Sequence, residues 1–99
     1  PFDVAVTVMT LHHIPDLAAV LTGFAGVLAP GGWLCIADLD AEDGSFHGEG
    51  FTGHHGFVRA ELAAALDAAG FTDITFHDCH HVERPDGTYP MFLAVCTRR

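Results

Sequence analysis

The first part of the chain has a hydrophobic pattern of strand, helix and strand. Phe2 to Val8 is almost wholly apolar and β-branched, which is typical of a strand covered on both faces in a parallel sheet. Between Asp16 and Leu28 the apolar residues fall on one side of a predicted helix, and the sequence APGG (Ala29 to Gly32) ends it. Trp33 to Asp38 is again apolar and predicts a second buried strand.

The second part of the chain begins with a long polar segment and ends in a hairpin. The segment from about Leu39 to Gly56 is rich in glycine, acidic residues and histidine, and long ordered loops are usually functional. A second helix is predicted from Val58 to Ala69. Thr72 to Val82 and Tyr89 to Thr97 are predicted strands, and the turn sequence RPDG between them makes them an antiparallel pair.

The order of these elements predicts the fold class. Strand, helix, strand, long loop, helix, strand, strand describes right-handed crossovers in an α/β domain. We expect a mostly parallel sheet with a C-terminal antiparallel hairpin, in one domain that spans residues 1–99.

Composition and charge restrict the partners. An apolar share of 49% with 17% charged residues is typical of a folded protein. The net charge of −9 repels phosphate backbones and anionic lipids, so we expect neither nucleic acid nor membrane as a partner. No window reaches the roughly 18 apolar residues of a membrane span, and no basic-then-apolar leader opens the chain, so a cytoplasmic location is expected.

Three residues with metal-binding side chains, His77, Cys79 and His81, alternate along one predicted strand. Alternate residues of a strand lie about 6.5 to 7 Å apart, which is too far for three of them to reach one ion without a bend. We therefore predict no metal site here.

Three stretches, FDVAVTVMTLHHIPD, LAPGGWLCIAD and ELAAALDAAGF, resemble the C-terminal half of a class I S-adenosylmethionine-dependent methyltransferase of the Rossmann-like, small-molecule type. The resemblance covers nearly the whole chain. It implies S-adenosylmethionine as cofactor, a small-molecule acceptor, and a sheet in the order first, second, fourth, third strand with only the last strand antiparallel.

The cofactor fingerprint of that family departs from this sequence. The family has a glycine-rich turn after its first strand and an acidic residue at the end of its second, and neither is found here. We therefore expect a fragment of a longer methyltransferase, or a truncated one, that does not hold the cofactor alone. The alternative is a noncatalytic remnant of the same fold that acts as an interaction module.

The resemblance places the cofactor at the end of the first strand, where ligands bind in open α/β sheets. It implies that the backbone there borders the methionine arm, and that His12 touches cofactor or substrate while His13 fixes the turn. The alternative is a structural histidine pair that closes the turn. The predicted cofactor-binding residues are Val8, Met9, Thr10, Leu11, His12 and His13.

The acceptor is expected between the second strand and the long loop. Asp38 either contacts the substrate, orients a neighbour of the substrate, or caps the loop. His54 or His55 could serve with His12 as catalytic groups, because imidazole is a suitable base near neutral pH. The alternative is a solvated loop with incidental histidines. The other predicted substrate-binding residues are Phe46, His47 and Phe51.

The strand from Phe2 to Val8 is central in the resembling fold, and here its outer edge has no partner in the predicted sheet. An apolar edge without lysine, bulge or central proline is a template for pairing with another chain. We therefore predict self-association through this edge.

Overall fold

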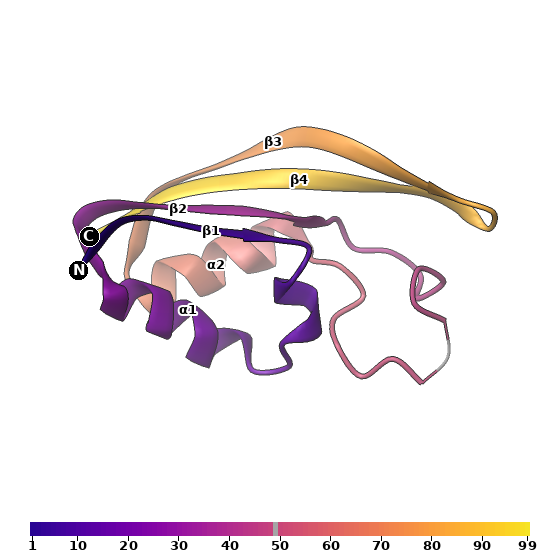
Figure 1. Cartoon of the computed structure of the whole chain (residues 1–99), viewed down its shortest axis with the longest axis horizontal. Coiled ribbons are helices and arrows are strands. Elements are labelled where there is room, and N and C mark those ends of the chain that lie inside the picture. The colour runs from indigo at the N-terminus through magenta and orange to yellow at the C-terminus, as the bar shows by residue number, and fades with distance from the viewer. Residues whose placement is uncertain (49) are drawn as a thin grey trace.

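The computed structural model describes residues 1–48 and 50–99, and its elements follow the predicted order (Figure 1). Among the described residues no helix is both long and apolar enough to cross a bilayer. The elements are the strands β1 (Phe2–Val8), β2 (Leu28–Leu39), β3 (Phe71–Arg84) and β4 (Gly87–Arg98), the helices α1 (Leu17–Val27) and α2 (Arg59–Ala69), and the short 3-10 helix η1 (Leu11–His13).

The sheet has the strand order β1-β2-β4-β3. Strand β1 pairs in parallel with β2, and β4 lies antiparallel between β2 and β3. The predicted order and directions are therefore confirmed. The main difference is at the start of β2, which begins at Leu28 rather than Trp33. Leu28 pairs with Phe2, and an irregularity follows before Val4 pairs with Trp33.

The two helices are held by local contacts and by a shared core. Asp16 caps α1, because its Oδ1 accepts a hydrogen bond from the backbone N–H of Ala19 over 3.0 Å. Arg59, at the start of α2, donates to Asp40 and to Asp78 and so ties the helix to the loop and to β3. The core between the helices and the sheet includes Leu11, Leu21, Leu28, Leu34, Ile36, Leu62, Leu66, Phe71 and Phe92.

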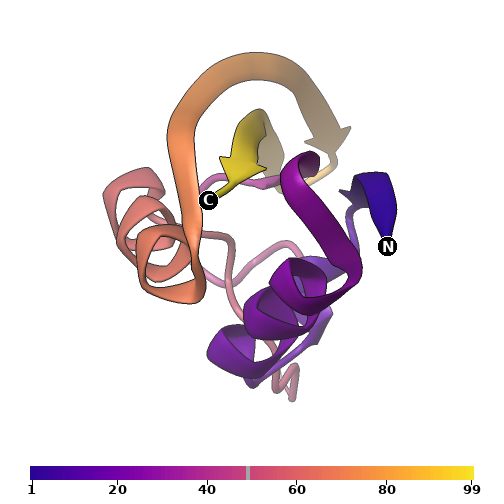
Figure 2. The ribbon, with the colours of Figure 1, turned by 90° about the vertical axis from the view of Figure 1, so that its left-hand side faces the viewer.

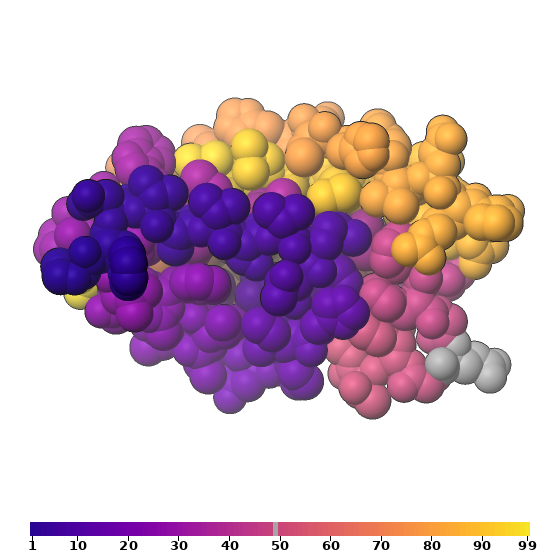
Figure 3. Space-filling view, viewed as in Figure 1, coloured from indigo at the N-terminus to yellow at the C-terminus, as the bar shows by residue number. Residues whose placement is uncertain are grey.

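Both helices lie on one side of the sheet, and the other side is open (Figures 1 and 2). The space-filling view shows β1 along the surface (Figure 3). Strand β1 is therefore covered on one face only, and the expectation of cover on both faces is wrong for this chain. The apolar residues on the open side of β1 and the start of β2 are Phe2 (65% exposed), Val4 (54%), Val6 (63%), Val8 (57%) and Trp33 (48%); we call them the open apolar strip.

Two glycines of α1, Gly23 and Gly26, are not required by packing. A Cβ added at either position would meet nothing within 4 Å. We expect Gly23→Ala and Gly26→Ala each to raise the free energy of unfolding by about 0.5–1 kcal/mol, because alanine has the higher helix propensity. Urea unfolding followed by circular dichroism measures this gain.

The control is Gly70→Ala, at the end of α2. Gly70 has φ +107°, a conformation that disfavours any side chain, so this substitution should destabilise the chain. A loss of stability in either α1 variant would show that these two glycines are needed for another reason.

Candidate functional site

The candidate site lies where the adjacent parallel strands β1 and β2 end. Directly after β1, Met9 has φ 51°, which is uncommon for a residue other than glycine and often marks a functional turn. Its N–H donates to the Ala37 carbonyl over 2.8 Å, and the chain then turns into η1. This turn carries His12 over Asp38, near the end of β2. Both residues were predicted site residues, and the structure brings them together.

His12 and Asp38 form a fully buried hydrogen-bonded pair. His12 Nδ1 lies 2.5 Å from Asp38 Oδ1, and the side chains are 1% and 0% exposed. The Asp38 carboxylate also accepts the backbone N–H of His12 over 3.1 Å and that of Leu39 over 2.8 Å. Because the carboxylate accepts at Nδ1, that nitrogen carries the proton and Nε2 of the neutral ring keeps a lone pair. Asp38 therefore orients the His12 ring, and it also caps the start of the loop by accepting from Leu39.

The ring of His12 has one unpaired nitrogen and lies among other rings. His12 Nε2 is buried and has no hydrogen-bond partner among the described residues. The ring centroid of His12 lies 4.2 Å from that of His13, 4.9 Å from that of His47 and 6.2 Å from that of Phe51. Phe51 stacks on His47 at 3.8 Å with an angle of 7° between the planes. Three of the predicted site residues therefore lie close to the ring that carries the unsatisfied nitrogen.

The three imidazoles of His12, His13 and His47 form what we call the imidazole cluster. One ring nitrogen from each lies within 4.8 Å of the other two. Burial, and then the neighbouring His12 and His13, lower the pKa of His47 from its ordinary value, which favours its neutral form. His12 is buried, His47 is half-buried and His13 is exposed, so the cluster opens to solvent on the His13 side.

The histidines of β3, where no metal site was predicted, do not belong to the imidazole cluster. His77 lies 3.2 Å from the Thr75 hydroxyl, and a bulge follows between Asp78 and His80. Within residues 1–48 and 50–99 the imidazole cluster is the one group of three potential ligands that comes together.

The long loop is anchored to η1 by Gly53 and His54. The N–H of His54 donates to the His12 carbonyl over 2.7 Å, and His54 Nε2 lies 2.9 Å from the Ile14 carbonyl, to which it can donate. A Cβ on Gly53 would lie 2.3 Å from the His12 carbonyl oxygen and 2.5 Å from the Phe51 ring, so only glycine fits. The role of Gly53 could not be predicted from the sequence, because a close approach between distant segments leaves no local signal.

The two loop histidines predicted as catalytic groups lie outside the cluster. His54 is bonded to backbone, as described above, and its ring lies 5.1 Å from that of Phe57. His55 is 44% exposed, and its Nδ1 lies 3.6 Å from Glu42 Oε1. The rings that adjoin His12, among the described residues, are those of His13, Phe46, His47 and Phe51.

The predicted cofactor-binding residues next to β1 differ in exposure. Val8 is exposed on the open side of the sheet, and the exposed Thr10 hydroxyl donates to the Val8 carbonyl over 3.0 Å. Met9 is half-buried and packs against the cluster of Leu39, Phe46, Tyr89 and Met91. The Leu11 side chain is fully buried in the main core, so it anchors η1 to the core and does not line the site.

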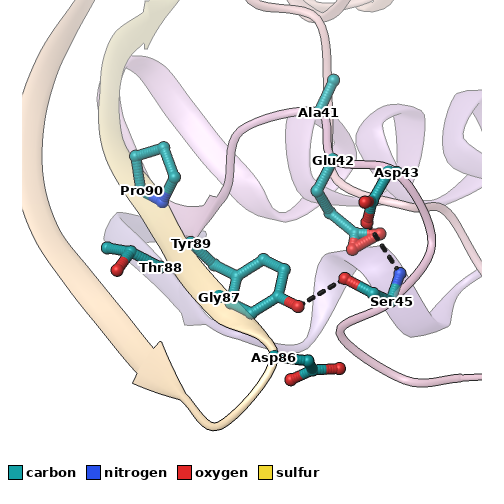
Figure 4. A pocket seen from close by; sticks show the side chains of 9 residues that line it. All are labelled: Ala41, Glu42, Asp43, Ser45, Asp86, Gly87, Thr88, Tyr89 and Pro90. Carbon is teal, nitrogen blue, oxygen red and sulfur yellow. Dashed lines mark hydrogen bonds between the residues drawn. The ribbon is translucent and has the colours of Figure 1, made fainter.

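The tip of the β3–β4 hairpin supports the loop from the other side. Arg84 places its guanidinium 4.1 Å from the centre of the Phe46 ring, and the hydroxyls of Ser45 and Tyr89 are hydrogen-bonded. Between the loop and the hairpin tip lies a pocket of about 320 Å³, whose lining residues Figure 4 shows. Phe46 separates this pocket from His12, since its ring lies 5.1 Å from Tyr89 and 6.5 Å from His12. The pocket is lined by Ala41, Glu42, Asp43, Ser45, Asp86, Gly87, Thr88, Tyr89 and Pro90.

Comparison with known sequences places residues 1–75 in one family. A family model described as a methyltransferase domain matches these residues. The chain is also 36% identical, over 75 residues, to a hybrid PKS-NRPS synthetase, ucsA, from an Acremonium species. That match covers 74% of this chain and 2% of the synthetase, so the chain spans only a small part of its curated relative.

Solved structures share the fold at low sequence identity. A possible histamine N-methyltransferase from Thermotoga maritima superposes with a TM-score of 0.77 at 18% identity, over 99% of this chain and 56% of that one. The CurJ carbon methyltransferase gives 0.73 at 16% identity, over 99% and 30%. The 1,6-didemethyltoxoflavin-N1-methyltransferase of Burkholderia thailandensis gives 0.68 at 24% identity, over 98% and 44%.

Proposed function

Because the chain belongs to the methyltransferase-domain family, we propose that it is part of an S-adenosylmethionine-dependent methyltransferase in which His12 is the general base. This membership confirms the methyltransferase resemblance of the three sequence motifs. The observation that carries the catalytic proposal is the buried hydrogen bond between His12 Nδ1 and Asp38, which leaves His12 Nε2 without a partner among the described residues.

The end of β1 fits the cofactor. Met9, in its left-handed conformation, turns the chain sharply, and the neighbouring Val8 and Thr10 are exposed at the strand end where ligands bind in such sheets. We assign the backbone from Val8 to Thr10 to the methionine arm. When bound, S-adenosylmethionine supplies an electrophilic methyl group. We assign its ribose and adenine contacts to a further part of a longer protein, the part that would cover the open apolar strip.

His12 removes the proton that the acceptor loses on methylation. Asp38 holds Nδ1–H and thereby keeps the lone pair on Nε2 and the ring in a fixed orientation. Nε2 takes the proton, and the resulting imidazolium is stabilised by the adjacent carboxylate. General-base catalysis of this kind contributes about 10²- to 10⁴-fold to a rate. His54 would hold η1 in place, since it bonds to the carbonyls of His12 and Ile14.

The acceptor we propose is a small molecule whose reacting atom carries a proton. The rings of His13, His47 and Phe51 lie close to that of His12, and aromatic surroundings of this kind suit a planar or conjugated acceptor. The structural neighbours include a carbon methyltransferase and a nitrogen methyltransferase, so the fold is compatible with either acceptor atom. The alternative of a noncatalytic interaction module gives no role to a buried imidazole nitrogen without a partner, which costs stability.

Two substitutions in the full-length protein test this role. His12→Gln removes the base, and we expect methyl transfer to fall at least about 100-fold. Asp38→Asn should have a similar effect, because an amide N–H facing Nδ1 forces the ring proton onto Nε2. Methylation is followed by transfer of labelled methyl groups, and circular dichroism checks that each variant folds.

The matched control is His80→Ala, which removes an exposed histidine of β3. This variant should keep the full rate. Full activity of His12→Gln, or an equal loss in His80→Ala, would count against His12 as the base.

A further inference from the structure

The imidazole cluster has the features of a metal site. Three histidines from two separate segments present ring nitrogens within 4.8 Å of one another. Because Asp38 occupies Nδ1 of His12, the nitrogen of this ring left for an ion is Nε2. It is buried without a hydrogen-bond partner among the described residues, although buried polar groups are normally satisfied. An imidazole nitrogen held free of other bonds is available as a metal ligand.

The surroundings of His12 match those of metal-binding histidines. Such histidines usually donate their other ring N–H to a carboxylate, which fixes the tautomer and raises the basicity of the ligand. Asp38 accepts from Nδ1 at 2.5 Å, and is itself held by two backbone N–H groups. His47 is also held in orientation, by its stacking on Phe51. Two of the three ligands are thus oriented before any ion binds.

We propose that His12, His13 and His47 bind a divalent transition-metal ion of the Zn²⁺ type, with Asp38 orienting His12. Imidazole ligands suit Zn²⁺, Co²⁺, Ni²⁺ and Cu²⁺, whereas Mg²⁺ and Ca²⁺ prefer oxygen. A Zn–N bond of about 2.0–2.1 Å puts ligand nitrogens about 3.3 Å apart, so from separations of up to 4.8 Å the cluster must close by at most about 1.5 Å. His13 is the exposed member of the cluster, so its side chain can make most of this movement while His12 and His47 keep their orientation.

Metal binding would regulate the reaction rather than promote it. An ion on Nε2 occupies the lone pair that His12 needs to accept a proton, so the ion and the base function exclude each other. This consequence rests on the proposed function, but the binding site does not. A metal ion of this type should therefore inhibit methyl transfer, and a chelator should restore it.

Binding is tested with Co²⁺ alone, added to the 99-residue chain and followed by its visible absorption, and then with Zn²⁺ as competitor. We expect one Co²⁺ per chain, displaced by Zn²⁺. The double variant His13→Ala/His47→Ala should weaken binding at least about 100-fold, and Asp38→Asn about 10- to 100-fold. Circular dichroism and light scattering check that the variants fold and that the ion does not simply aggregate the chain.

The matched control is His77→Ala/His81→Ala, which removes the same number of histidines from the exposed face of β3. This variant should bind Co²⁺ like the parent chain. Equal weakening in both double variants, or no saturable binding in the parent, would overturn the site. Binding of Co²⁺ without inhibition of the full-length protein would keep the site and contradict the base role of His12.

Discussion

Asp38→Ala is expected to lower the free energy of unfolding by about 3–5 kcal/mol. The carboxylate is 0% exposed and accepts three hydrogen bonds, from the backbone N–H and Nδ1–H of His12 and from the N–H of Leu39. Alanine would leave all three donors buried without an acceptor. A domain of this size has about 5–15 kcal/mol of stability in total, so the variant should be largely unfolded or close to it. Urea unfolding followed by circular dichroism measures the loss.

Two further variants separate this effect from a general sensitivity to losing a carboxylate. Asp38→Asn keeps an oxygen acceptor for a backbone N–H and keeps the side-chain volume, so its loss should be clearly smaller. Asp67→Ala removes a carboxylate that is 73% exposed and pairs with Arg99 at the surface, and it should change stability by at most about 0.5 kcal/mol. If Asp38→Ala were as stable as Asp67→Ala, the buried pair would not be a stabilising element.

The path of the chain was predictable because local pattern and family resemblance agreed. The apolar runs gave the strands, and the resemblance gave the place of β4 between β2 and β3, which no local signal contains. The open face of β1 was not predictable in this way. A continuous apolar run reads the same whether both faces are covered or one is exposed, and only the structure shows Val4 and Val6 uncovered.

The candidate site was predictable as a set of residues but not as an arrangement. His12 and Asp38 were each recognised at a strand end. Their hydrogen bond depends on the register in which Val8 pairs with Ala37, because that register brings the turn after β1 over the end of β2. In the loop, His47 and His54 are alike in sequence context. The close approach of Gly53 to η1 sends His54 to the backbone, while stacking on Phe51 keeps His47 beside His12.

We expect the 99-residue chain by itself to self-associate through β1. This strand pairs with β2 on one side and has no partner strand on the other in the described sheet. Its unpaired backbone groups lie beside the open apolar strip, and an apolar edge of this kind is a template for another chain. Sedimentation or multi-angle light scattering at micromolar concentrations should show dimers or larger species rather than a monomer.

Val6→Lys should weaken this association, because Val6 is 63% exposed in the middle of the open apolar strip and a lysine there opposes edge pairing. Val6 lies on the open face of β1, whereas its neighbour Ala5 packs against the core. Val58→Lys is the matched control, since it makes the same exchange and the same change of net charge at a valine that is 48% exposed, next to α2 and away from β1. An increase in monomer with Val6→Lys alone locates the contact on β1. A monomeric parent chain would contradict the prediction directly. Equal effects of the two lysines would also contradict it, because only Val6 lies on the strand whose backbone edge is unpaired.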